Sequence, residues 1–195
     1  MLRQLRSSVL AVVLLTLLLG LAYPLAITGL AQVLWPHQAS GSRVEQHGRL
    51  VGSLLIGQDF LGDPRYFQSR PSVTRDDGAD AAASNLGPNS ARLAAEIRSR
   101  LRAYLRRERR YDPGLRAAAV PADAVTASAS GVDPDISIPN ATIQAHRVAA
   151  VRGLPLSVVM RLISEHTDGV ASGLFGPVSV NVLALDLALD AEQRR

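Results

Sequence analysis

The residues that most often carry chemistry are few in this chain and lie far apart. Cysteine and lysine are absent from its 195 residues, so every basic side chain except histidine is an arginine. Thiolate zinc sites, cysteine nucleophiles, Schiff-base lysines and the GxxxxGK[ST] phosphate loop are therefore excluded. Neither G-x-S-x-G nor S-x-x-K occurs, and no ligand-like spacing relates the four histidines, His37, His47, His146 and His166. The sequence therefore predicts no metal site and a chain that is not an enzyme.

Two loops rich in small residues are the other candidates for chemistry. They read SNLGPNS at residues 84–90 and TASASGVDP at residues 126–134. Small residues allow successive backbone N–H groups to converge on an anion, which makes Ser128, Ser130 and Gly131 weak candidates for cofactor contact. Ordinary turn and cap chemistry explains the same residues. We prefer that second interpretation and assign no cofactor.

The element that must position everything else is an apolar run at residues 7–36. It contains no charged residue and no histidine, and a bilayer core of about 30 Å needs only about 20 helical residues. A cleaved signal peptide ending near Ala22 is the alternative, but the apolar character continues to Trp35. We therefore expect a retained transmembrane helix, preceded by a short basic cytoplasmic segment at residues 1–6.

The composition of this run predicts how it is oriented and packed. Arg3 and Arg6 precede it, so the positive-inside rule places the N-terminus in the cytoplasm and the following domain outside. Pro24 predicts a kink, and Gly20 and Gly29 would let another membrane helix approach closely. These three residues are our candidates for helix packing within the bilayer.

Residues 37–195 have the size of one soluble domain, and their patterns predict an α+β fold. We expect helices at residues 91–110, 138–152 and 155–166, and strands at residues 49–58 and 178–189. The first helix carries eight arginines around an apolar stripe. A solvated face is the preferred interpretation, and a surface for acidic lipid headgroups or an acidic partner is the alternative.

The two helices around Gly153 also imitate a DNA-reading helix-turn-helix, which suggests a membrane-tethered regulator as a rival function. Any short-turn helical hairpin needs the same small and apolar residues, however. The second helix offers few side chains suited to base edges, chiefly Ser157, Arg161 and Ser164. A domain outside the cytoplasm would also meet no nucleic acid, so we favour a packing hairpin.

Several segments together resemble the KdpC subunit family of the bacterial ATP-driven high-affinity potassium importer. The most specific are SNLGP at residues 84–88 and TASASG at residues 126–131, and the matching segments keep the family's order over nearly the whole length. The others are GLAYP at 20–24, VGS at 51–53, IGQ at 56–58, RPS at 70–72, RVA at 147–149 and VNVL at 180–183. Asp186 stands where the family commonly has Asn.

The resemblance implies an accessory subunit of the inner membrane that works with a channel-like subunit that binds potassium (KdpA), an ATP-hydrolysing pump subunit (KdpB) and a small membrane subunit (KdpF). ATP and potassium are then handled by the complex. The family is commonly described as helping the pump use ATP, but cytoplasmic ATP cannot reach a domain outside the membrane. We therefore expect a role in assembly, stability and potassium access, with Asn85, Gly87, Gln144 and Arg147 as candidates for partner interfaces.

Overall fold

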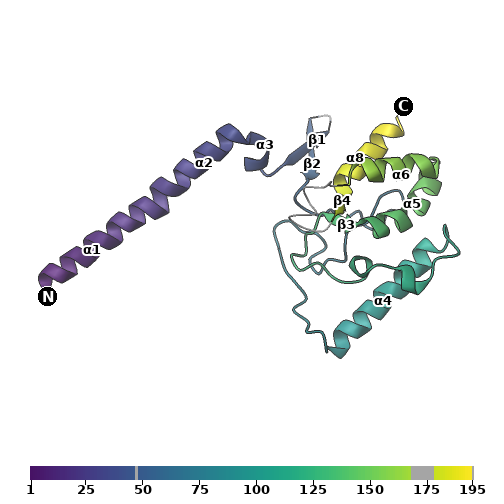
Figure 1. Ribbon diagram of the computed structural model, residues 1–195, viewed down its shortest axis with the longest axis horizontal. Coiled ribbons are helices and arrows are strands. Elements are labelled where there is room, and N and C mark those ends of the chain that lie inside the picture. The colour runs from purple at the N-terminus through teal and green to yellow at the C-terminus, as the bar shows by residue number, and fades with distance from the viewer. Residues whose placement is uncertain (47, 168–177, 195) are drawn as a thin grey trace. The chain divides into compact units, whose positions relative to one another are not determined.

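The computed structural model describes residues 1–46, 48–167 and 178–194 (Figure 1). The chain consists of two compact units, Met1–Leu50 and Val51–Arg195. The first unit is mainly one long helical segment. It comprises α1 (Leu2–Leu17), a π-helical turn η1 (Leu18–Ala22) and α2 (Tyr23–Leu34). Because Pro24 lacks an N–H and its ring would crowd the carbonyl of Gly20, a wider turn at this point relieves the clash. The structure thus accommodates Pro24 inside a continuous helix.

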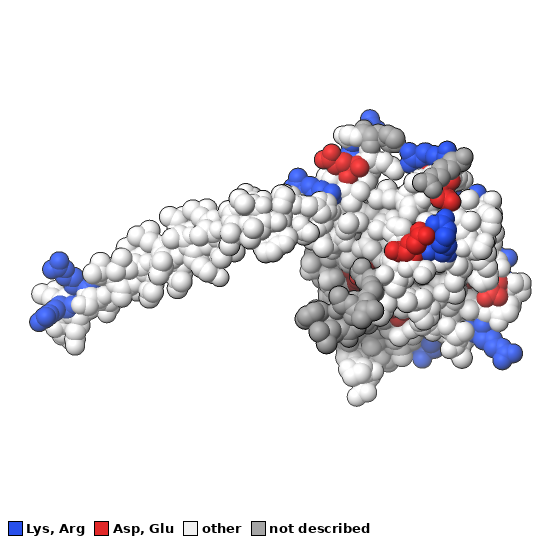
Figure 2. All heavy atoms as spheres, turned by 45° about the horizontal axis from the view of Figure 1, so that its top comes forward, with Lys and Arg blue, Asp and Glu red and all other residues white. Residues whose placement is uncertain are grey.

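The helical segment Leu2–Leu34 is the one described helix that is long and apolar enough to cross a membrane, judged by length and composition. It begins five residues before the predicted start at residue 7 and ends two residues before the predicted end at residue 36. None of its most apolar window is buried against the protein. Figure 2 shows blue side chains at its free end and an uncharged surface along the rest of its length. A single turn, α3 (Pro36–Ala39), follows Trp35, and the two-stranded pair of β1 (Arg43–Gln46) and β2 (Arg49–Ser53) comes next.

The three predicted helices of the domain are confirmed with small changes at their ends. In α4 (Ala91–Glu108), Ser90 is the N-cap and its hydroxyl accepts a hydrogen bond from the N–H of Leu93. In α5 (Ile138–Arg152), Ser137 caps the start, and Gly153 closes the end in the left-handed conformation with φ of 68°. The next helix, α6 (Leu156–Glu165), begins after Pro155.

The strand predicted at residues 178–189 is wrong. Only β4 (Ser179–Asn181) is extended, and it pairs antiparallel with β3 (Asp135–Ser137). The rest forms the helix α8 (Val182–Glu192), for which Asn181 is the N-cap. The strand predicted at residues 49–58 is also shorter, because only β2 is extended. Two short 3₁₀ turns complete the described elements, η2 (Ala117–Ala119) and η3 (Ala122–Ala124).

The main core lies where α5, α6, α8 and the β3–β4 pair meet. Val148, Val159, Val180 and Leu185 have no exposed surface there, and neither does Phe67 from the long irregular segment before α4. A second, smaller cluster lies under α4, and its buried members are Tyr104, Leu105, Leu115, Ala124 and Val125. Packing against these two clusters determines the direction in which the polar side chains of α5 point.

Candidate functional site

A row of polar side chains on α5 is buried inside the domain. Asn140, Gln144 and Arg147 are 1%, 1% and 0% exposed. Their spacing of four and three residues places them on one helix face. Buried polar groups of this kind are stable only when hydrogen bonds replace the water they have lost. The contacts of this row therefore show what it holds in place.

Arg147 joins three parts of the domain. Its Nε lies 3.1 and 3.2 Å from the carboxylate oxygens of Glu108 on α4. Its Nη1 donates to the backbone carbonyls of Pro64 and Tyr66 at 2.6 and 2.9 Å, and its Nη2 donates to Gln144 at 2.7 Å. The guanidinium group therefore fixes the irregular segment before α4 against both helices.

Gln144 and Asn140 continue this network. Gln144 accepts a hydrogen bond from the N–H of Gln68 at 2.8 Å and donates to the carbonyl of the same residue at 3.1 Å. Asn140 accepts from the hydroxyl of Tyr104 at 2.8 Å and donates to Asp123 at 2.9 Å. The amide of Gln144 thus pairs with one residue of the irregular segment much as a neighbouring strand would.

Asp186 on α8 holds the same segment from the other side. Its Oδ1 accepts a hydrogen bond from the N–H of Phe67 at 3.0 Å, and the residue is 2% exposed. Burial raises the pKa of Asp186 well above its ordinary value of 3.8, while the hydrogen bond from Phe67 opposes this change. Its second oxygen has no hydrogen-bond partner among the described residues. The interior therefore favours the neutral form of this carboxyl group more than water does.

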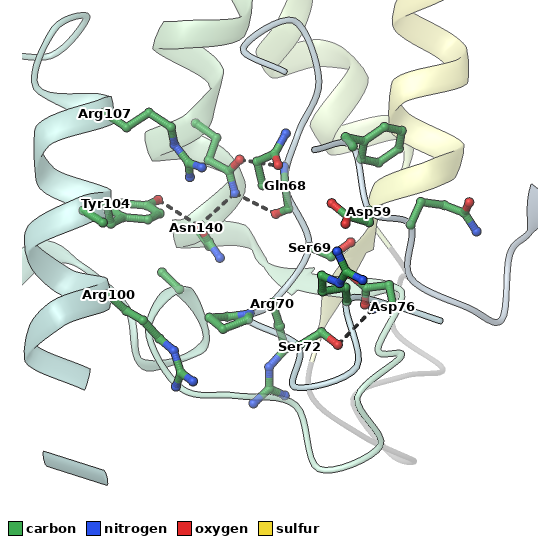
Figure 3. Close-up of a pocket in the computed structure, with 17 residues that line it drawn as sticks. Asp59, Gln68, Ser69, Arg70, Ser72, Asp76, Arg100, Tyr104, Arg107 and Asn140 are labelled. Carbon is green, nitrogen blue, oxygen red and sulfur yellow. Dashed lines mark hydrogen bonds between the residues drawn. The ribbon is translucent and has the colours of Figure 1, made fainter. Parts of the chain in front are cut away.

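A cavity of about 460 Å³ opens between α4 and the segment that this network holds (Figure 3). Amide, hydroxyl and charged side chains make up most of its lining. Four guanidinium groups border it, together with two carboxylates; these residues are Arg70, Arg75, Arg100, Arg107, Asp59 and Asp76. A cavity with this lining can bind a polar ligand group through charge-assisted hydrogen bonds.

The charges of the cavity are partly compensated inside the domain. Arg70 pairs with Asp133 at 3.0 Å, and Arg100 pairs with Glu96 at 3.1 Å. Burial, with smaller contributions from the neighbouring Asp59 and Asp133, raises the pKa of Asp76 to about 6. The negative charge of the lining therefore decreases as the pH falls through this value.

The small-residue loop at residues 126–134 uses its polar groups internally. The hydroxyl of Ser128 accepts from the N–H groups of Ser130 and Gly131 at 3.2 and 3.1 Å. The N–H of Ser128 donates to the carbonyl of Pro71, and that of Val132 donates to the hydroxyl of Ser130. The N–H groups of Ser130 and Gly131 meet at the Ser128 hydroxyl and the other two donate elsewhere, so hydrogen bonds within the domain occupy all four, as in ordinary turn chemistry. The N–H groups of Ser128, Ser130 and Gly131 are not free to bind a cofactor.

The four interface candidates fall into two groups. Asn85 and Gly87 are exposed on the loop before α4, where Asn85 adopts a positive φ of 51°. Gln144 and Arg147 lie in the interior, and the contacts described above occupy both side chains. Neither side chain is exposed, so we correct the expectation that Gln144 and Arg147 contact a partner. Their hydrophilicity reflects an internal network.

The helical hairpin of α5 and α6 packs into the core. Val159, Leu162 and Ile163 of α6 are buried there. Arg161, one of the side chains considered for base contacts, pairs with Glu165 and Glu192 at 2.9 and 3.3 Å. Packing therefore accounts for the small and apolar residues around Gly153.

Within the described ranges, no group of three or more His, Asp or Glu side chains could hold a metal ion. His47 lies outside these ranges. Sequence reasoning missed Glu108 and Asp123, which are essential to the buried network. Glu108 lies among the arginines of α4, at a spacing that is typical of ion pairs on the surface of a helix. Its burial therefore becomes visible only in the folded structure.

Comparison with known proteins finds relatives over most of the chain. The family model described as "KdpC: K+-transporting ATPase, c chain" matches residues 5–191. A potassium-transporting ATPase KdpC subunit of Variovorax paradoxus is 52% identical over 95% of both chains. The protein of the same name from Nitratidesulfovibrio vulgaris is 50% identical over 98% of this chain and 95% of its own, and one from Cereibacter sphaeroides is 47% identical over 98% of both.

Proposed function

We propose that this chain, which belongs to the KdpC family of K+-transporting ATPase subunits, is a non-catalytic accessory subunit anchored in the inner membrane. The membrane helix is the segment Leu2–Leu34, and the domain lies outside the cytoplasm. There it stabilises the assembly of the channel-like subunit KdpA, the pump subunit KdpB and the small subunit KdpF. It also assists the access of potassium to the complex.

The observation that carries this proposal is the charge pattern around the helix. Arg3 and Arg6 lie at its start, and no charged residue follows until Arg43. Such an asymmetry favours a cytoplasmic N-terminus. A domain on the opposite side has no access to cytoplasmic ATP, so its influence on ATP hydrolysis must pass through contacts with the other subunits. The exposed loop with Asn85 and Gly87 is a candidate for such a contact.

Purification of the chain with the other subunits tests the proposal. We expect the full-length chain, tagged at its C-terminus and extracted in mild detergent, to retain an ATPase that potassium stimulates. Omitting this chain when the other subunits are expressed should reduce the yield of the assembled complex. Asn85→Asp combined with Gly87→Asp alters the proposed contact loop, and this variant should retain less of the complex while remaining in the membrane. A wild-type chain that retains no potassium-stimulated ATPase would refute the accessory function.

A further inference from the structure

Five arginines, three on α4 and two in the turn that follows it, form an exposed face. We call Arg98, Arg102, Arg106, Arg109 and Arg110 the arginine face. All five side chains are exposed, and the three on α4 follow one another at intervals of four residues, which confines them to roughly one quarter of the helix circumference at about 100° per residue. The arginines that border the cavity, Arg100 and Arg107, lie on another side of the helix. The arginine face is therefore a separate surface from the cavity.

The arginine face has almost no compensating charge, unlike the other arginines of α4. Arg92 and Arg100 both pair with Glu96, and Arg107 pairs with Glu108. Among the residues that the structure describes, no ion pair reaches any member of the arginine face. Arg109 donates to the backbone carbonyl of Leu115, which leaves its charge uncompensated.

This arrangement is unfavourable for the isolated helix. Arg98, Arg102 and Arg106 follow one another at intervals of four residues within α4, and like charges at this spacing destabilise a helix. The face contributes no apolar packing in return, because the apolar side chains of α4, such as Leu101 and Leu105, pack towards the domain. A partner of opposite charge would convert this repulsion into attraction.

The form of the face favours a protein over a lipid surface. A helix that binds a membrane through its surface inserts apolar side chains among its basic ones, and the arginine face has none to insert. A hollow of about 290 Å³ lies among Arg102, Leu105, Arg106 and Arg109. Guanidinium groups around such a hollow can bind the carboxylate of an Asp or Glu side chain in bidentate geometry.

We infer that the arginine face is a docking surface for an acidic face of another protein subunit, whose carboxylates pair with its guanidinium groups. The inference rests on the proposed function, because it requires the chain to work within an assembly. It adds the surface and the chemistry of the partner.

The absence of lysine permits a direct test. The Arg106→Lys variant keeps the charge and introduces the only lysine of the chain, so its amine differs from every other side chain. A water-soluble carbodiimide joins this amine to a nearby carboxylate as an amide, and the carbodiimide takes up the displaced oxygen as a urea. In the purified complex we expect a covalent link from position 106 to an Asp or Glu of another subunit, identified by mass spectrometry. Arg116→Lys, at an exposed arginine outside the face, should give no such link.

Charge reversal gives an independent readout. Arg102→Glu combined with Arg106→Glu should lower the amount of the other subunits that co-purify at least tenfold at moderate salt, whereas Arg116→Glu should leave it unchanged. If the wild-type chain retains the complex, and neither the cross-link nor the loss is seen, the inference is wrong while the proposed function stands. If the double variant instead loses binding to vesicles containing phosphatidylglycerol and keeps its subunits, the surface binds lipid and the inference is also wrong. If the wild-type chain retains no complex, both proposals fail together.

Discussion

The buried guanidinium group of Arg147 donates hydrogen bonds to four residues inside the domain. One of these acceptors is the buried carboxylate of Glu108. Removing one member of a buried ion pair leaves the other charged and poorly solvated, which costs more than the pair itself contributes. The network also leaves two backbone carbonyls without a donor when the guanidinium is lost. The residue is therefore expected to matter for stability rather than for direct contact with a partner.

We predict that Arg147→Met lowers the free energy of unfolding by about 3 kcal/mol or more, because Glu108 keeps only Arg107 as a partner. Chemical denaturation of the full-length chain in detergent measures this. Arg161→Met is the matched control, since Arg161 forms its ion pairs in solvent and its loss should leave the unfolding midpoint nearly unchanged. Equal effects of the two substitutions would contradict the structural importance of the buried network.

Asp186 gives a second prediction for a single residue. Its pKa is raised in the folded protein above its value in the unfolded chain, so the folded state binds the proton more tightly. The stability that this proton provides is complete below the unfolded pKa, about pH 4. It is lost as the pH rises from there through the higher pKa of the folded protein. Asp186→Asn keeps the acceptor for the N–H of Phe67 and removes the ionisable group.

We therefore expect Asp186→Asn to raise the free energy of unfolding at pH 7 and to have little effect near pH 4. Denaturation curves of the two proteins between pH 4 and pH 8 measure the difference. A variant that is less stable than the wild type at pH 7 would show that an ionised Asp186 is stabilised inside the domain, contrary to this account.

Among the elements, those with caps and periodic apolar stripes were predictable. Ser90, Ser137 and Gly153 marked helix ends that the structure confirms within a few residues. The error at α8 has a physical cause, because a helix buried on most sides shows a continuous apolar run that resembles a buried strand. Asn181 was the available sign of a helix start, since its side chain accepts from the N–H of Ala184.

The polar network of α5 could be predicted only in part. The spacing of Gln144 and Arg147 indicated a shared face, which the structure confirms through their hydrogen bond. Their burial depended on Glu108 of α4 and on the segment around Phe67, which are distant in sequence. A pattern within one helix cannot reveal partners of that kind, so these residues were assigned to an interface.

The membrane helix carries a prediction at the scale of an element. A Cβ built on Gly29 meets nothing within 4 Å, and one on Gly20 meets only Thr16 at 3.9 Å. The helix itself therefore tolerates larger residues at both positions. We expect Gly20→Leu combined with Gly29→Leu to leave membrane insertion intact and to reduce the yield of the assembled complex.

Ala11→Leu combined with Ala26→Leu is the matched control, because it adds similar volume elsewhere on the same helix. Alkaline extraction of membranes measures insertion, and co-purified subunits measure assembly. If the glycine variant and the alanine variant assemble as well as the wild type, the helix is a plain tether and our assignment of packing to Gly20, Pro24 and Gly29 is wrong.

For the whole molecule, the central question is on which side of the membrane the domain lies. Family membership establishes a subunit of a potassium-transporting ATPase, and the charge pattern of the N-terminus supports an external domain. An external domain can act on potassium entry and on assembly, whereas a cytoplasmic one could contact ATP. The orientation therefore decides between these mechanisms.

A pair of C-terminal fusions measures the orientation most directly. Alkaline phosphatase is active only outside the cytoplasm, and green fluorescent protein exported by the general secretory route is dark. Fused after Arg195 of the full-length chain, the phosphatase should be active and the fluorescent protein should be dark, with equal amounts of both fusions in the membrane. A bright fluorescent fusion with an inactive phosphatase would place the domain in the cytoplasm and contradict the account.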